Sequence, residues 1–201
     1  MKVIGITGQA GSGKSVVLDM LEKEFNGYVI IADDVSRRQM EPGHASFIRT
    51  LEHFGPSILT ADGKIDRFKL AEIVFSNKKE LEFLNSFTHQ YVEEEIKNTI
   101  SMVKELGTYS AIFVEFAVIT KSDFTDIFDQ IWYVCTNEET RRQRMKENRG
   151  YSDEKIDNII QNQKKSEEFA DLCDFTIENN GDLEELRENL KKIFVKIDDL
   201  T

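Results

Sequence analysis

The sequence predicts an α/β fold in which a parallel sheet of about five strands carries helices on both faces. Apolar, β-rich runs alternate with helical patterns, as in parallel sheets buried on both sides. The runs lie at about 2–7, 28–32, 110–116, 131–135 and 173–177. The octapeptide Gly8–Ser15 also fits the pattern G-x-x-x-x-G-K-[ST] at every fixed position. Together these observations predict a P-loop NTPase fold with two inserts.

The phosphate-binding pattern lies between a short apolar run and the first turns of a helix, the context that it requires. Its glycines let backbone N–H groups cradle phosphate oxygens, and the helix N-terminus adds partial positive charge. We expect Lys14 to reach the β- and γ-phosphates and Ser15 to bind Mg²⁺. A dinucleotide-binding loop fits less well, because Val16 stands where a third glycine is expected. The residues predicted to bind the nucleotide here are Gly8, Gln9, Ala10, Gly11, Ser12, Gly13, Lys14, Ser15 and Val16.

Composition narrows the class of protein. The chain has 201 residues, enough for one domain with inserts, and 26 basic against 37 acidic residues give a net charge of −11. This charge does not favour binding to nucleic acid or to membranes. No apolar run approaches a membrane span, and a strand predicted at the first residues leaves no room for a signal peptide, so we expect a cytoplasmic protein. Cys135 and Cys173 lack metal-ligand spacing and are expected to be buried, reduced thiols.

The uneven spacing of the runs indicates the inserts. The long stretch between two predicted strands, 32–110, is mainly helical, and Asp66 is a plausible N-cap within it. We therefore predict a nucleotide-binding core at about 1–36, 108–140 and 171–201. A helical acceptor-binding insert spans about 37–107 and a lid about 141–170. Such inserts commonly hold the acceptor substrate and close over the phosphates.

A GTP-dependent switch is excluded by its missing motifs. No D-x-x-G occurs in the chain, and the nearest match to N-K-x-D, Asn77–Glu80, lies between two helical patterns. We interpret that match as a helix boundary. A kinase instead needs an acceptor-side base and cations near the transferring phosphoryl group.

Asp33 is the candidate for the base, because it follows a predicted strand at the carboxyl edge of the sheet, where ligands bind. Either Asp33 or Asp34 could instead cap a helix that begins near Val35. We assign the cap to Asp34 and the catalytic role to Asp33.

The candidate cations lie in a tight arginine cluster at Arg141, Arg142, Arg144 and Arg149. Such a run is commonly a solvated helix face, here mixed with glutamates. Its place after the fourth strand, at the start of an insert, favours a lid arginine. At least one of the four is expected to be ordinary surface.

Short motifs are spread over nearly the whole length of the chain. They are Ile6–Ser15, Ala32-Asp33 with Arg37, Glu41–Gly43, His53–Gly55, Asp62–Arg67, Ile73–Asn77, Leu84-Asn85 with His89, and Asn179–Gly181. In the order and spacing of these motifs the chain resembles the dephospho-coenzyme A kinases, and this match is more specific than the phosphate loop alone.

The resemblance implies transfer of the ATP γ-phosphate, with Mg²⁺, to the 3′-hydroxyl of the small-molecule substrate dephospho-CoA. It implies that Asp33 is the general base and that Arg144 is the lid cation. By the same resemblance, Arg37, Arg67 and His89 contact the acceptor, and Asn179 with Asn180 lies beside the adenine. From the residues alone, Asn-Asn-Gly is equally a tight turn. The oligomeric state is not predicted.

Several residues depart from the family pattern and keep other functions open. Ile31 replaces a usual Asp, Gln90 a Pro, Ile119 an acid, and Asn148 a second lid arginine that Arg149 follows one place late. One alternative is a nucleoside or nucleotide kinase, in which Glu115 organises Mg²⁺ or the acceptor hydroxyl. Another is a regulatory protein that binds ATP without turnover.

Overall fold

The protein is described here by a computed structural model that covers residues 1–116, 125–163 and 173–198. The chain forms two compact units. The core unit contains Met1–Ile30 and Val103–Thr201, and the helical unit contains Ile31–Met102. Ile119 and the lid residues 164–170 lie outside the described residues, and the predicted division into core, insert and lid stays a prediction.

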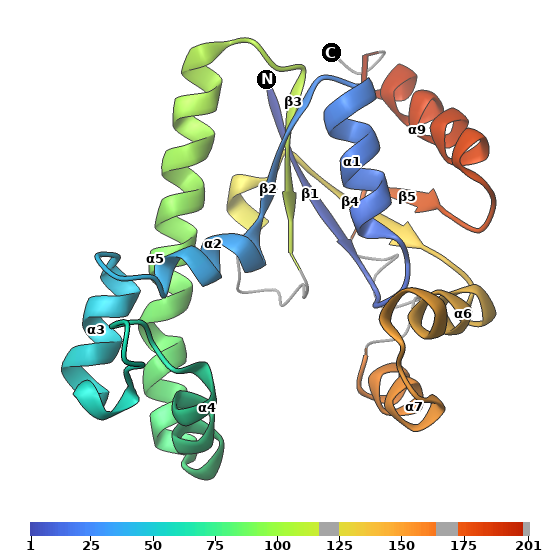
Figure 1. The fold of residues 1–201 in the computed structure, drawn as a ribbon. Helices are drawn as coiled ribbons and strands as arrows, with labels where there is room; N and C mark the ends of the chain where they lie inside the picture. The colour runs from blue at the N-terminus through green and yellow to red at the C-terminus, as the bar shows by residue number, and fades with distance from the viewer. Residues whose placement is uncertain (117–124, 164–172, 199–201) are drawn as a thin grey trace. The chain divides into compact units, whose positions relative to one another are not determined.

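The core unit is built on a five-stranded sheet whose strand order is β2-β3-β1-β4-β5 (Figure 1). Its strands are β1 (Lys2–Gly8), β2 (Gly27–Ile31), β3 (Ala111–Glu115), β4 (Gln130–Cys135) and β5 (Phe175–Glu178). β1 pairs in parallel with both β3 and β4, and β4 pairs in parallel with β5. All five predicted strands are confirmed, although β5 begins two residues after the predicted run.

Helices α1 (Lys14–Glu24) and α9 (Leu183–Asp198) cover one face of this sheet (Figure 1). Apolar strand residues such as Ile4, Ile6 and Trp132 are buried beneath them. On the opposite face, Phe116 and Phe128 stack at 5.1 Å over Gly5. A Cβ at Gly5 would lie 2.7 Å from the Phe116 ring, so this strand position has no room for a larger residue.

Two helices follow β4 in the core unit, α6 (Glu138–Arg149) and α7 (Asp153–Asn162), and a short η2 (Thr125–Ile127) precedes it. Asn137 starts α6 by accepting a hydrogen bond from the Thr140 N–H at 2.8 Å, a typical N-cap. Arg142 of α6 pairs with Asp157 of α7 at 2.6 Å. This ion pair joins the two helices.

The helical unit contains α2 (Ala32–Gln39), α3 (Ala45–Phe54), η1 (Pro56–Ile58), α4 (Arg67–Ser76) and most of α5 (Lys78–Leu106). Its core includes Phe47, Ile58, Ile65, Leu70 and Val74. The predicted cap is confirmed, since Asp66 accepts hydrogen bonds from Phe68 and Lys69 N–H groups. The boundary predicted near Asn77 is confirmed too, because α4 ends and α5 begins there.

The predicted cap at Asp34 is wrong. β2 runs directly into α2, whose N-cap is Ile31, and no side chain caps the helix. Asp33 and Asp34 both lie in its first turn, where the partial positive charge of the helix end stabilises a carboxylate. Asp34 accepts from Arg37 at 2.9 Å instead.

The two cysteines are free, as predicted, and both are half-buried. Cys135 pairs with Glu178 in the sheet, whereas Cys173 precedes Glu178 by five residues. The Asp174 N–H donates to the Ile131 carbonyl oxygen, so Cys173 lies near the start of β4. Cys135 is four strand residues further along β4, a distance of roughly 13 Å that is too long for a disulfide. Among the described residues, no helix combines the length and apolar character needed to cross a membrane.

Candidate active site

The phosphate loop runs from the end of β1 to the first residue of α1. Gly11 and Gly13 adopt positive φ angles, 78° and 85°, which non-glycine residues seldom adopt. The space around them is also closed. A Cβ at Gly11 would lie 2.8 Å from the Arg141 carbonyl oxygen, and one at Gly13 would lie 2.3 Å from Asn179 Nδ2. The loop is therefore a backbone cradle that only glycine allows at these positions, as phosphate binding requires.

Lys14 begins α1 and its ammonium folds back over the loop. Nζ donates to the Gly8 carbonyl oxygen at 2.7 Å and to that of Gln9 at 3.5 Å. It also lies 3.9 Å from the carboxylate of Glu115, the last residue of β3. The structure thus brings Lys14 and Glu115 together at the carboxyl edge of the sheet.

The Ser12 carbonyl oxygen is held by side chains from distant parts of the core unit. Asn179 Nδ2 donates to it at 2.9 Å, and Thr136 Oγ1 lies at the same distance. The Thr136 hydroxyl also lies 3.0 Å from the Asn179 carbonyl oxygen, and its single proton serves one acceptor at a time. Arg144 Nη1 approaches Ser12 O at 3.5 Å. The predicted lid cation therefore lies beside the loop.

Asn179 is only 5% exposed, so its side chain supports the loop from below, which the sequence did not indicate. Asn180 is exposed, and its Oδ1 accepts from the backbone N–H of Asn137 at 2.8 Å. This contact joins the end of β5 to the start of α6. Contact of these two residues with adenine stays a prediction.

The arginine cluster separates into four different environments. Arg141 is buried against the loop, and Arg144 is half-buried beside it. Arg142 pairs with Glu138 and Asp157. Arg149 is exposed at the end of α6, 6.0 Å from the Tyr151 ring. Sequence reasoning did not single out Arg141, because the spacing of four arginines does not show which of them faces the loop.

The candidate residues of the helical unit are exposed. Asp33 lies in the first turn of α2, Arg67 begins α4, and His89 lies within α5. Within the part of the chain that the structure describes, the Arg37–Asp34 ion pair is the one contact of these acceptor-side candidates with a charged neighbour. Their grouping into one acceptor site stays a prediction.

Helix α2 is anchored to α5 at its far end. Glu95 of α5 accepts from Arg38 Nε at 2.6 Å and from Gln39 Nε2 at 2.5 Å. Gln39 is buried, and its Oε1 accepts from the Ser46 N–H. Glu95 therefore fixes the helix that carries Asp33.

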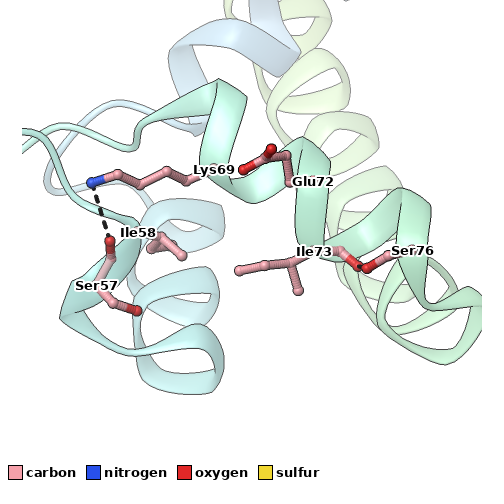
Figure 2. A pocket seen from close by; sticks show the side chains of 6 residues that line it. All are labelled: Ser57, Ile58, Lys69, Glu72, Ile73 and Ser76. Carbon is pink, nitrogen blue, oxygen red and sulfur yellow. Dashed lines mark hydrogen bonds between the residues drawn. The ribbon is translucent and has the colours of Figure 1, made fainter.

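The helical unit has a pocket of about 430 Å³, whose lining side chains are drawn in Figure 2. Lys69 donates to the Ser57 carbonyl oxygen there at 3.4 Å. The lining residues are Ser57, Ile58, Lys69, Glu72, Ile73 and Ser76. None of these lining residues is among the site residues predicted from the sequence, so we assign this pocket no part in the predicted phosphoryl transfer.

The fit of the loop to Mg²⁺ rests on Ser15, which is exposed at the second position of α1. In the described residues, no group of three or more His, Cys, Asp or Glu side chains is arranged to hold a metal ion. Mg²⁺ in phosphoryl-transfer proteins is usually held by few protein ligands together with substrate phosphates and water. The residues present fit that mode, with the Ser15 hydroxyl as the protein ligand.

The family model and the most similar relatives point to the same protein family. The family model for dephospho-CoA kinase matches residues 2–185. The dephospho-CoA kinase of Carboxydothermus hydrogenoformans is 36% identical over 196 residues, which cover 98% of this chain and 94% of the relative.

Solved structures show the same fold. A structure from Thermus thermophilus is 25% identical, covers 97% of each chain and gives a TM-score of 0.78. The dephospho-CoA kinase from Campylobacter jejuni is 22% identical, covers 97% of this chain and 96% of its own, and gives a TM-score of 0.72. At that identity the second likeness shows the fold alone.

Proposed function

The chain belongs to the dephospho-CoA kinase family and phosphorylates dephospho-CoA with ATP, and from this premise we propose how its side chains divide the reaction. The γ-phosphoryl group passes to the 3′-hydroxyl of the acceptor, which gives CoA and ADP. The observation that carries the proposal is the glycine-dependent loop over which Lys14 is folded.

On the donor side, the phosphate loop and the first residues of α1, together Gly8 to Val16, hold the ATP phosphates. Lys14 exchanges its contacts with the Gly8 and Gln9 carbonyl oxygens for the β- and γ-phosphates. The Ser15 hydroxyl holds Mg²⁺, which when bound neutralises charge on the phosphate oxygens. Glu115, 3.9 Å from Lys14, keeps the ammonium near the loop between rounds of nucleotide binding.

Arg144 supplies the lid cation. Its guanidinium lies beside Ser12 and Gly13 in the loop, and a Cβ at Gly13 would be 3.3 Å from Nη1. A short movement of this long side chain brings its charge onto the transferring phosphoryl group. Charge that develops there in the transition state is stabilised by such a cation.

On the acceptor side, the exposed carboxylate of Asp33, in the first turn of α2, takes the proton of the 3′-hydroxyl as the general base. The acceptor is bound by the exposed side chains of Arg37, Arg67 and His89. Cationic side chains and hydrogen-bond donors of this kind bind phosphate groups, which the acceptor carries. The protein acts on a small molecule, and we propose that it works in the cytoplasm.

One coupled assay tests this function. Release of ADP is measured with Mg²⁺-ATP alone and after addition of dephospho-CoA, AMP or a nucleoside. We expect turnover with dephospho-CoA. Turnover with AMP or a nucleoside instead would support the kinase of different specificity, and ATP binding without turnover on any acceptor would support the regulatory alternative.

A further inference from the structure

We propose that Arg141 is a positioning residue that fixes the phosphate loop in its ATP-binding shape and links the loop to α7. The proposal rests on the proposed function only in that the loop binds ATP. It concerns residues of the core unit alone. The role that it assigns to Arg141 differs from that of the lid cation Arg144.

Arg141 extends from α6 into the base of the loop, where it is 4% exposed. Its Nε donates to the Ala10 carbonyl oxygen at 2.9 Å, and its Nη1 donates to Gln9 Oε1 at 2.5 Å. Its Nη2 donates to Gln163 Oε1, at the end of α7, at 2.9 Å. One planar guanidinium therefore holds two successive loop residues and a second helix in a fixed geometry.

Gln163 completes the link because its Oε1 also accepts from the Ala10 N–H at 3.2 Å. Both backbone groups of Ala10 are thus tied to the pair formed by Arg141 and Gln163. In a planar trans peptide the carbonyl and the following N–H point in opposite directions. Holding the Ala10 carbonyl toward Arg141 therefore turns the Gly11 N–H to the other side of the loop, where it is available to a phosphate oxygen.

The charge of Arg141 adds to this geometric effect. Burial lowers the pKa of the Arg141 guanidinium, but arginine remains protonated in proteins. Its three hydrogen-bond acceptors described above are neutral carbonyl oxygens. The nearby Glu138 carboxylate favours this charge, but no carboxylate accepts a hydrogen bond from the guanidinium among the described residues, so the charge at the base of the loop also favours the phosphates of ATP.

The neighbouring arginine provides a matched control. Arg142 occupies the next position of the same helix, but it pairs with Glu138 and Asp157 and makes no described contact with the loop. Substitution of either arginine removes the same charge from the same helix. A difference between them therefore reports contact with the loop rather than charge or helix propensity.

The test measures binding of mant-ATP, a fluorescent ATP analogue, with Mg²⁺ and without acceptor, for Arg141→Lys, Arg141→Gln, Arg142→Lys and Arg142→Gln. We expect Arg141→Gln to raise the Kd of mant-ATP by about tenfold to hundredfold, from the loss of charge-assisted hydrogen bonds. Arg141→Lys should lie between, and the Arg142 variants should stay within about twofold of the parent. In turnover assays KM for ATP should rise more than kcat falls.

A purely structural role would lower the melting temperature of Arg141→Gln and leave its Kd for mant-ATP unchanged below that temperature. That result would overturn the proposal. If Arg141→Gln does not fold, Arg141→Lys and Gln163→Leu carry the same comparison. Because no acceptor is present, a wrong assignment of dephospho-CoA as substrate would not alter these binding results.

A double-mutant cycle tests the link to α7. We expect Arg141→Gln and Gln163→Leu each to weaken mant-ATP binding, and their combination to weaken it less than the product of the two effects. Residues joined in one hydrogen-bond network couple in this way. Independent, multiplicative effects would overturn the link between the loop and α7.

Discussion

The core unit and the helical unit hold their candidate residues in different ways. Around the phosphate loop, Asn179 and Arg141 are buried and donate to loop oxygens. In the helical unit Asp33, Arg67 and His89 are exposed. Preorganised dipoles stabilise charge without reorganisation, whereas exposed side chains lose rotamer freedom when a ligand orders them. We therefore expect the donor site to be built before ATP binds, and the proposed acceptor site to be completed by its substrate.

The largest effect is expected from Asp33→Asn, in the helical unit. The amide keeps the size of the side chain but cannot take the acceptor proton, so kcat should fall by about 10²–10⁴. The Kd of mant-ATP and the melting temperature should change little, because Asp33 is an exposed side chain and is not part of the phosphate loop. A less stable protein with near-normal kcat would contradict the catalytic assignment.

Lys14→Ala tests the prebuilt site itself. Removal of one preorganised charge typically costs about 10²–10³ in kcat, and we expect a loss of this size at saturating ATP. The side chain is half-buried at the edge of the sheet and contacts loop carbonyl oxygens, so the fold should survive. Steady-state kinetics and thermal unfolding are measured together. Near-normal kcat would mean that this loop does not carry the reaction.

Arg144→Ala tests whether α6 supplies a cation to the phosphoryl group. A cation that meets the phosphoryl group in the transition state should lower kcat and kcat/KM together, by roughly 10². Arg142→Ala should leave both unchanged and serves as the control. Equal behaviour of the two variants would mean that α6 contributes no lid cation.

The smallest effect concerns the reactivity of the Cys173 thiol, which lies just before β5 in the core unit. Burial, with a smaller contribution from Asp174, raises the pKa of the Cys173 thiol to about 11. Because only the thiolate reacts with iodoacetamide, alkylation of Cys173 at pH 8 should be much slower than that of an exposed cysteine, and should speed up toward pH 11. Mass spectrometry of the peptide that contains Cys173 gives the rate. Fast alkylation at pH 8 would show that the thiol is not protected.

Features that depend on neighbours in the chain were predictable from the sequence. The five strands follow from apolar runs, the phosphate loop from its fixed spacing, and the start of α4 from Asp66. Each of these signals lies within a few residues of the structure that it specifies. The cap assigned to Asp34 failed for the opposite reason. Whether β2 needs a capping turn before α2 depends on how the strand enters the helix, and the local residues do not show it.

The supports of the loop were not predictable, because their partners are far away in the chain. Arg141 and Arg142 are adjacent and chemically identical, yet one is buried against Gln9 and the other pairs with Asp157. Asn179 resembled a turn residue, although its amide reaches Ser12. A signal was available in hindsight, since Gln9 is a long polar side chain inside a glycine-rich loop and needs a buried partner.

The side chains that donate to the Ser12 carbonyl oxygen also determine when, during synthesis, the contacts of the phosphate loop can form. The phosphate loop is among the first residues to be synthesised. Thr136 and Asn179, which donate to the Ser12 carbonyl oxygen of the loop, lie 124 and 167 residues further along the chain. Contacts of such long sequence separation form late, because the closing of long chain segments costs entropy first. A nascent chain that ends before β5 therefore carries the whole phosphate-binding motif but lacks Asn179, one of the side chains that donate to the Ser12 carbonyl oxygen. We therefore expect the complete set of loop supports, and with it full ATP binding, only in chains that extend past β5.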